Sequence, residues 1–146
     1  MIKYPIAIFI SGRGSNLKSI ADACKKKEYP AEIKVVFSNN KNAPGLSFAK
    51  ENNLEAITLD YHNFKNTEEY EEKIISLLKP YDLELICLAG YMKILSKKLI
   101  DHYPKKIINI HPSLLPKYKG LNTHRRVLEN NEDRTGCTVH YVNQEM

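Results

Sequence analysis

Short, mostly apolar runs alternate with segments of helical length, and this pattern constrains the fold of the chain more than any other feature. Residues 6–10, 33–37, 83–88 and 107–110 form such runs. Strands that are covered by helices on both faces of a parallel sheet have this character, because neither face meets water. The pattern therefore predicts an α/β fold: a Rossmann-like open, mostly parallel sheet with helices on both faces, as one domain over residues 1–146.

Helix start and stop signals lie between these runs. Pro44 suits the first turn of a helix, and Ser96 is placed to cap a short one. Asn66 and Glu69 stand at capping-box spacing before an apolar helical face, and Pro80 ends the helix that follows them. We expect helices at residues 17–24, 44–53, 67–79, 97–102 and 123–130, and further strands at 56–59 and 136–142.

Composition and charge exclude several classes of protein. No apolar run approaches the roughly 20 residues of a membrane helix, and the start shows no signal-peptide pattern. Three widely spaced cysteines fit a reducing compartment and have no metal-ligand spacing. The net charge of +5 is spread over short lysine clusters, which favours a small anionic substrate over nucleic acid. We expect a cytoplasmic protein, monomeric or homodimeric, that uses no metal, membrane or nucleic acid.

The segment from Ser11 to Asn16, here called the glycine loop, reads Ser-Gly-Arg-Gly-Ser-Asn between the first expected strand and its helix. Its glycines permit a tight turn, and N–H groups at the helix start can hold a phosphate. Leu17 stands where a dinucleotide fingerprint needs its third glycine, and Ser38 and Asn39 end the second strand where an acidic residue is expected. A phosphate cradle is therefore favoured over a nicotinamide site, with a purely structural turn as the alternative.

Asn109 and His111 end a short strand, two residues apart, so they project from the same face of it. An amide donor beside an imidazole suits acyl transfer, because the amide can bind a developing oxyanion while the imidazole stabilises it or moves a proton. The alternative is that both side chains only satisfy backbone groups at the strand end. Ser113 lacks the Gly-x-Ser-x-Gly elbow of a nucleophilic serine. His124 is either a ligand contact or a residue of a helix start.

The loop of residues 89–95 follows another buried strand and reads Ala-Gly-Tyr-Met-Lys-Ile-Leu. Such a loop can offer backbone amides and apolar area to a flat heterocycle. Packing against the core is the alternative reading of its apolar side chains.

Taken together, these segments resemble the phosphoribosylglycinamide formyltransferases (GAR transformylases), folate-dependent enzymes of purine synthesis. The matching segments are residues 10–17, 36–39, 88–95, 109–120, 123–124 and 136–140, in collinear order over nearly the whole chain. The broader group of formyltransferases and formyl hydrolases shares the Asn-x-His element. The glycine loop and Pro-Ser-Leu-Leu-Pro-Lys-Tyr with Thr-His point to this member.

The resemblance implies that a formyl group passes from 10-formyltetrahydrofolate, the cosubstrate, to the primary amine of a phosphorylated ribosyl-glycinamide, without a metal. It also implies roles for particular residues. Those that would hold the phosphate are Gly14, Ser15, Asn16 and Lys106. Those that would line the folate pocket are Met92, Lys93, Ile94 and Leu95. Asn109 and His111 would act on the tetrahedral intermediate.

The chain departs from the family pattern in one important respect. The family's third catalytic residue, an aspartate that organises the histidine and a water, would fall immediately after Met146. Glu145 is one carbon longer and two positions early, so it is not a substitute. Thr67 is a smaller departure, where some members carry a basic residue near the pterin. We therefore expect a formyltransferase catalytic domain that lacks its C-terminal part. The alternatives are a formyltetrahydrofolate hydrolase, another formyltransferase of the same fold, or an inactive phosphate-binding fragment.

Overall fold

Alternating strands and helices make up residues 3–111 and 138–142, which are the residues that the computed structural model describes. The strands are β1 (Tyr4–Ile10), β2 (Ala31–Ser38), β3 (Ala56–Thr58), β4 (Leu85–Leu88), β5 (Ile107–His111) and β6 (Thr138–Tyr141). The helices are α1 (Ser15–Cys24), α2 (Pro44–Glu51), α3 (Thr67–Leu78) and α4 (Lys97–His102), with short 3₁₀ turns η1 (Tyr61–Asn63) and η2 (Lys79–Tyr81). The helix expected at residues 123–130 lies outside the described residues.

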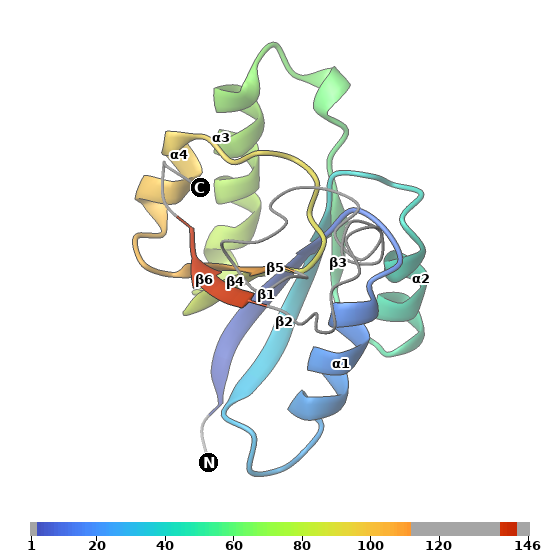
Figure 1. Cartoon of the computed structure of the whole chain (residues 1–146). Coiled ribbons are helices and arrows are strands. Elements are labelled where there is room, and N and C mark those ends of the chain that lie inside the picture. Colours follow the sequence, from blue (N-terminus) through green and yellow to red (C-terminus); the bar gives the residue numbers. More distant parts are fainter. Residues whose placement is uncertain (1–2, 112–137, 143–146) are drawn as a thin grey trace, which may run out of the picture.

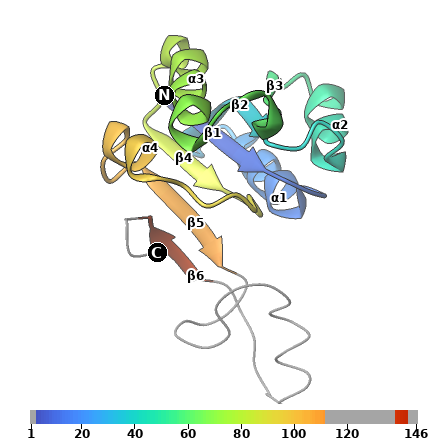
Figure 2. The same cartoon turned by 90° about the horizontal axis from the view of Figure 1, so that it is seen from above.

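The strands form one sheet in the order β3-β2-β1-β4-β5-β6. Neighbouring strands from β3 to β5 run parallel, and β6 pairs antiparallel with β5 at the edge (Figure 2). The open, mostly parallel sheet predicted from the sequence is thus confirmed. The direction of β6 was not predictable, because the apolar pattern of a strand is the same in either direction.

Helices cover both faces of this sheet, since successive side chains of a buried strand point to opposite faces. In β1, Ile8 and Ile10 join a core cluster that includes Leu17 of α1 and Ala49 of α2. Phe9, between them, joins a second cluster on the other face. The further members of that second cluster include Tyr70, Ile74 and Leu78 of α3 and Leu99 of α4. Figure 1 shows α1 and α2 on one side of the strands and α3 and α4 on the other.

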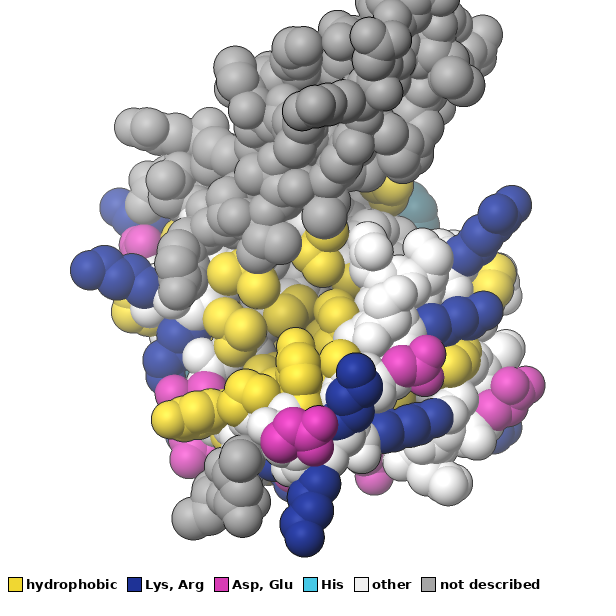
Figure 3. Space-filling model, turned by 60° about the horizontal axis from the view of Figure 1, so that its bottom comes forward, with side chains coloured by type: hydrophobic (Ala, Val, Ile, Leu, Met, Phe, Trp, Pro, Cys, Tyr) yellow, Lys and Arg dark blue, Asp and Glu magenta, His cyan; other side chains and the backbone are white. Residues whose placement is uncertain are grey.

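The helical cover is uneven among the described residues. On the face of α1 and α2, Leu85 of β4 and Ile108 of β5 are only partly buried against the core cluster. Figure 3 shows apolar side chains gathered on the surface of one side of the molecule. Helices therefore lie on both faces of the sheet, but the described helices cover β4 and β5 less completely on the face of α1 and α2 than on the face of α3 and α4.

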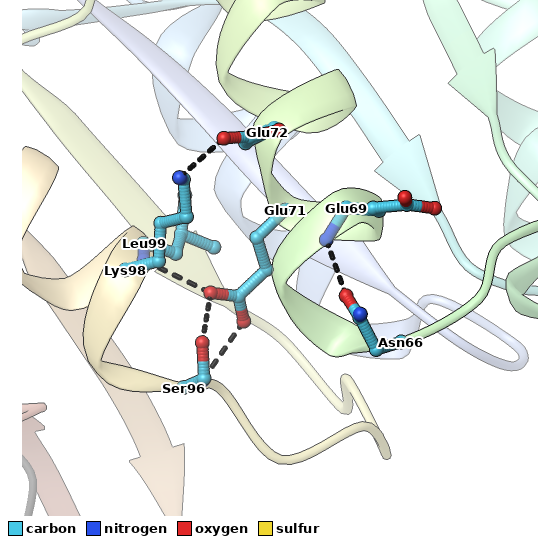
Figure 4. A network of polar contacts seen from close by, with 7 residues as sticks. All are labelled: Asn66, Glu69, Glu71, Glu72, Ser96, Lys98 and Leu99. Carbon is cyan, nitrogen blue, oxygen red and sulfur yellow. Dashed lines mark hydrogen bonds and ion pairs between the residues drawn. The ribbon is translucent and has the colours of Figure 1, made fainter.

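The side chain of Glu71, in α3, caps the start of α4. The sequence predicted this role for Ser96. Glu71 is only 2% exposed. Its carboxylate accepts hydrogen bonds from the backbone N–H groups of Ser96 (2.8 Å) and Leu99 (2.9 Å) and from the Ser96 hydroxyl (Figure 4). The Ser96 side chain accepts no capping bond from the helix. Ser96 thus occupies the N-cap position before α4, as predicted, but its side chain does not supply the capping bond: its hydroxyl donates to Glu71, and the Glu71 carboxylate satisfies the helix N–H groups.

We expect Glu71→Ala to lower the free energy of unfolding by about 3 kcal/mol, because it leaves buried donors at the start of α4 without their acceptor. The midpoint of thermal unfolding should fall by about 6 to 12 °C. Glu72→Ala is the matched control, since Glu72 is exposed and pairs with Lys98 at the surface. It should change the midpoint by less than about 2 °C. Equal shifts in the two variants would contradict the capping role.

Candidate active site at the carboxyl ends of the strands

The carboxyl ends of β1, β4 and β5 meet at one edge of the sheet. The chain runs from β1 outward to β2 and β3 and then returns to the other side of β1 with β4, so the strand order reverses between β1 and β4. Phe9 of β1 is level with Leu88 of β4, which is level with Asn109 of β5. Two strand spacings separate β1 from β5, or about 10 Å. Ligands of open α/β sheets bind at such a reversal, beyond the carboxyl ends.

The glycine loop leaves β1 and leads directly into α1. Gly14 precedes the helix with φ +73°, a left-handed conformation that favours glycine. A Cβ on Gly14 would stand 3.1 Å from the Cα of Gly45 in the first turn of α2, and the Gly45 N–H donates to the Gly12 carbonyl at 3.0 Å. Ser15 is exposed and Asn16 half-buried in the first turn of α1. The loop is therefore a tight turn with helix N–H groups at its end, as a phosphate cradle requires.

Gly14→Val tests this turn. A β-branched residue at φ +73° meets both backbone strain and the Gly45 contact, so we expect it to cost about 2 kcal/mol of stability. It should also raise the KM of a phosphorylated acceptor roughly tenfold, because displaced N–H groups no longer reach the phosphate. Gly12→Ala is the control for stability, since a Cβ there meets nothing within 4 Å. An unchanged acceptor KM in Gly14→Val would count against the cradle.

The 89–95 loop divides its side chains between the core and the surface. The Tyr91 ring packs 5.3 Å from that of Phe9, centroid to centroid, and burial raises the pKa of its hydroxyl well above the usual range. Burial also raises the pKa of the neighbouring Tyr70 to about 12, so both phenols stay protonated. Met92 and Ile94, by contrast, are 64% and 85% exposed. Tyr91 therefore packs against the core, whereas Met92 and Ile94 are exposed, and a contact of these two side chains with folate stays a prediction.

Lys93 and Leu95 turn the other way. The Lys93 ammonium lies 3.4 Å from the centroid of the Tyr61 ring, a cation–π contact that joins the loop to η1. Leu95 is half-buried against the core cluster on the α3 face. Four residues were expected to line a folate pocket. Of these, Met92 and Ile94 are exposed to solvent, whereas Lys93 and Leu95 contact other residues of the protein.

Asn109 is half-buried near the end of β5, opposite His140 of β6 in the sheet register. His111 is the last residue of β5 and pairs with Thr138, one residue beyond the end expected from the sequence. The placement of its side chain, and the segment containing Ser113 and His124, lie outside the described part of the chain. The structure brings Asn109 and the backbone of His111 to the same edge as the glycine loop.

Lys106 does not share this edge. It precedes β5, so it lies at the amino end of that strand, where its carbonyl accepts from the Ile86 N–H at 2.7 Å. Asn109 lies three residues further along, toward the opposite edge. A five-residue strand advances about 3.3 Å per residue, so the backbone of Lys106 is separated from the glycine loop by nearly the full length of the strand.

Two polar side chains support the loops at this edge in ways that were not predicted from the sequence. Ser11, at the start of the glycine loop, donates to the Asn39 side chain and accepts from the Met92 N–H. Glu71 supports the far end of the 89–95 loop through Ser96. Glu71 had a readable signal, because it lies three and seven residues before the buried Ile74 and Leu78 and so shares their apolar face. Ser11 had none, since its partners are distant in sequence.

Residues 3–111 and 138–142 lack two kinds of feature. None of their helices combines the length and apolar character that crossing a bilayer demands. Nor do their histidine, cysteine, aspartate and glutamate side chains gather in groups of three or more that could hold a metal ion.

An open α/β sheet with a glycine turn leading into a helix at its strand reversal, and an amide on a nearby strand end, defines a class of small-molecule-binding domains that includes acyl-transfer enzymes. The model of the formyl transferase family matches residues 4–146, and the chain belongs to this family.

Comparison with known proteins shows which members of the formyl transferase family the chain resembles. It is 43% identical to a phosphoribosylglycinamide formyltransferase of Escherichia coli over 97% of its own length. It is 40% identical to a trifunctional purine biosynthetic protein of Gallus gallus, covering 99% of this chain and 14% of that protein. The crystal structure of phosphoribosylglycinamide formyltransferase from Brucella melitensis superposes with a TM-score of 0.94 at 40% identity, over 98% of this chain and 74% of that one. The chain spans 66% of the length of the Escherichia coli relative.

Proposed function

We propose that this chain provides the formyl-transfer site of an enzyme that moves a formyl group from 10-formyltetrahydrofolate to the primary amine of 5'-phosphoribosylglycinamide, in purine synthesis. Residues 1–146 then act as one catalytic domain. The observation that carries the proposal is the shared sheet edge: the glycine loop follows β1 and Asn109 lies near the end of β5, and these two strands are about 10 Å apart, with β4 between them. Membership of the formyl transferase family and the names of the relatives support the choice of reaction.

The reaction needs two kinds of help from the protein. The acceptor amine attacks the formyl carbon, and the formyl oxygen gains negative charge in the tetrahedral intermediate. When this intermediate collapses, the bond to the folate nitrogen breaks, and that nitrogen takes up a proton as the amine loses one. An amide N–H stabilises the first charge, and an imidazole can carry the proton or stabilise the intermediate.

In this scheme the two substrates approach from different loops. The acceptor phosphate binds N–H groups of Gly14, Ser15 and Asn16, while Met92 and Ile94 contact the folate. Asn109 donates to the oxyanion, and His111 acts on the proton. Lys106 is left out of the phosphate site, because β5 carries it to the opposite edge.

Acceptor dependence is the test. The native protein, with its intact mass measured in the same preparation, is assayed for loss of the formyl group from 10-formyltetrahydrofolate with and without the amine acceptor. We expect turnover only with acceptor and formation of the formylated amide. Turnover without acceptor would indicate a hydrolase, and phosphate binding without any turnover would indicate a binding module; either result contradicts the proposal.

We also propose that the protein works in the cytoplasm as a monomer or homodimer on small molecules. Cys24 and Cys87 are both free thiols, and Cys87 is buried, which fits a reducing compartment. Cell fractionation and light scattering of the purified protein test the location and the assembly.

A further inference from the structure

The Ser11 hydroxyl links three loops that follow three different strands. It donates to the Asn39 side-chain oxygen (2.6 Å), just after β2, and accepts from the Met92 N–H (2.8 Å), four residues after β4. The Ser11 carbonyl also accepts from the Asn40 side chain at 3.2 Å. A hydroxyl that donates and accepts at once is fixed in orientation, and each of its bonds strengthens the other. This linkage stands at the reversal of strand order between β1 and β4.

The 89–95 loop has few other ties to the sheet. The Ala89 N–H donates to the Phe9 carbonyl at 2.9 Å, but residues 90–95 make no backbone–backbone hydrogen bond within the described part of the chain. Gly90 turns the chain with φ +78° in open space. Beyond it, Tyr91 is held by ring packing, and Ser96 by Glu71. The Ser11 hydroxyl is therefore the hydrogen-bond acceptor that ties the backbone of exposed Met92 to the glycine loop, while the next residue, Lys93, is held by its cation–π contact with Tyr61.

We propose that Ser11 is a positioning residue, whose hydroxyl sets the distance between the glycine loop and the 89–95 loop and so holds two ligands in register for transfer between them. This inference rests on the proposed function, because it assigns the acceptor phosphate to the first loop and the folate to the second. Asn39 orients the hydroxyl. Asn39 follows β2, where a dinucleotide site would carry a ribose-binding acid, and its side chain instead contacts Ser11 within the protein.

The test compares Ser11→Ala, which removes the hydroxyl, with Ser11→Thr, which keeps it, in the native protein. Ser76→Ala, an exposed serine of α3, is the control for serine replacement. Binding of tetrahydrofolate and of ribose 5-phosphate is measured separately by calorimetry, and kcat and KM are measured for both substrates. Thermal unfolding of each variant separates positioning from loss of fold.

In Ser11→Ala we expect tetrahydrofolate affinity and kcat each to fall roughly tenfold, while ribose 5-phosphate affinity stays within about twofold. Ser11→Thr should recover most of both losses. Unchanged folate affinity and kcat in Ser11→Ala, or equal losses in the alanine and threonine variants, would overturn the inference while leaving the proposed function intact. If the native protein binds neither probe, the proposed function fails, and the inference fails with it.

Discussion

Replacing His111 with alanine is expected to lower kcat for formyl transfer by roughly 10²- to 10⁴-fold, the loss typical of a removed proton-transfer group. The residue ends β5, at the same edge as the glycine loop. An imidazole there can exchange a proton with the amine or the departing folate nitrogen at physiological pH. Steady-state kinetics of the native protein measure the effect.

His102→Ala is the matched control for His111→Ala. His102 is exposed at the end of α4, where its ring contacts Tyr103, and α4 leads into the amino end of β5. We expect this variant to keep kcat within about twofold, as surface substitutions usually have small effects. Near-normal turnover in His111→Ala would remove the histidine from the mechanism.

The second large effect is expected at Asn109. Asn109→Ala should lower kcat by roughly 10²- to 10³-fold, because it removes a fixed donor from the place where the formyl oxygen becomes charged. The KM values should change little, since the interaction strengthens only in the transition state.

Asn109→Asp makes the test sharper, because aspartate has the shape of asparagine but no N–H donor when ionised. It should be at least as slow as Asn109→Ala, because the carboxylate also repels the oxyanion. Asn63→Ala, in exposed η1, is the control. An active Asn109→Asp variant would contradict the oxyanion role.

Local pattern was sufficient for most of the fold. The apolar runs located β1, β2, β4 and β5 because strands buried on both faces have few polar positions. The capping signal at α3 was also read correctly, since the Glu69 N–H donates to the Asn66 side chain at 2.9 Å. The reciprocal bond differs by one residue: the Glu69 carboxylate accepts from the Lys65 N–H. Helix ends follow such local contacts, so they are readable from a sequence.

Contacts between segments that are distant in sequence could not be predicted from local sequence patterns. Glu71 caps a helix 25 residues further on, and Ser11 meets Met92 across 81 residues. Nothing in the neighbourhood of any of these residues encodes its partner. Lys106 shows a different problem: the resemblance assigned it to the phosphate site, but it precedes β5, and the extended strand carries its backbone away from the end where Asn109 lies.

The proposed reaction requires a single ligand to reach from the glycine loop, which follows β1, to the end of β5, two strand spacings or about 10 Å from β1. A crystal structure of the native protein with 5'-phosphoribosylglycinamide tests this directly. We predict the phosphate within hydrogen-bond distance of the N–H groups at Gly14 to Asn16, and the amine of the same molecule beside Asn109. An acceptor bound with its phosphate elsewhere, or with its amine directed away from β5, would contradict it.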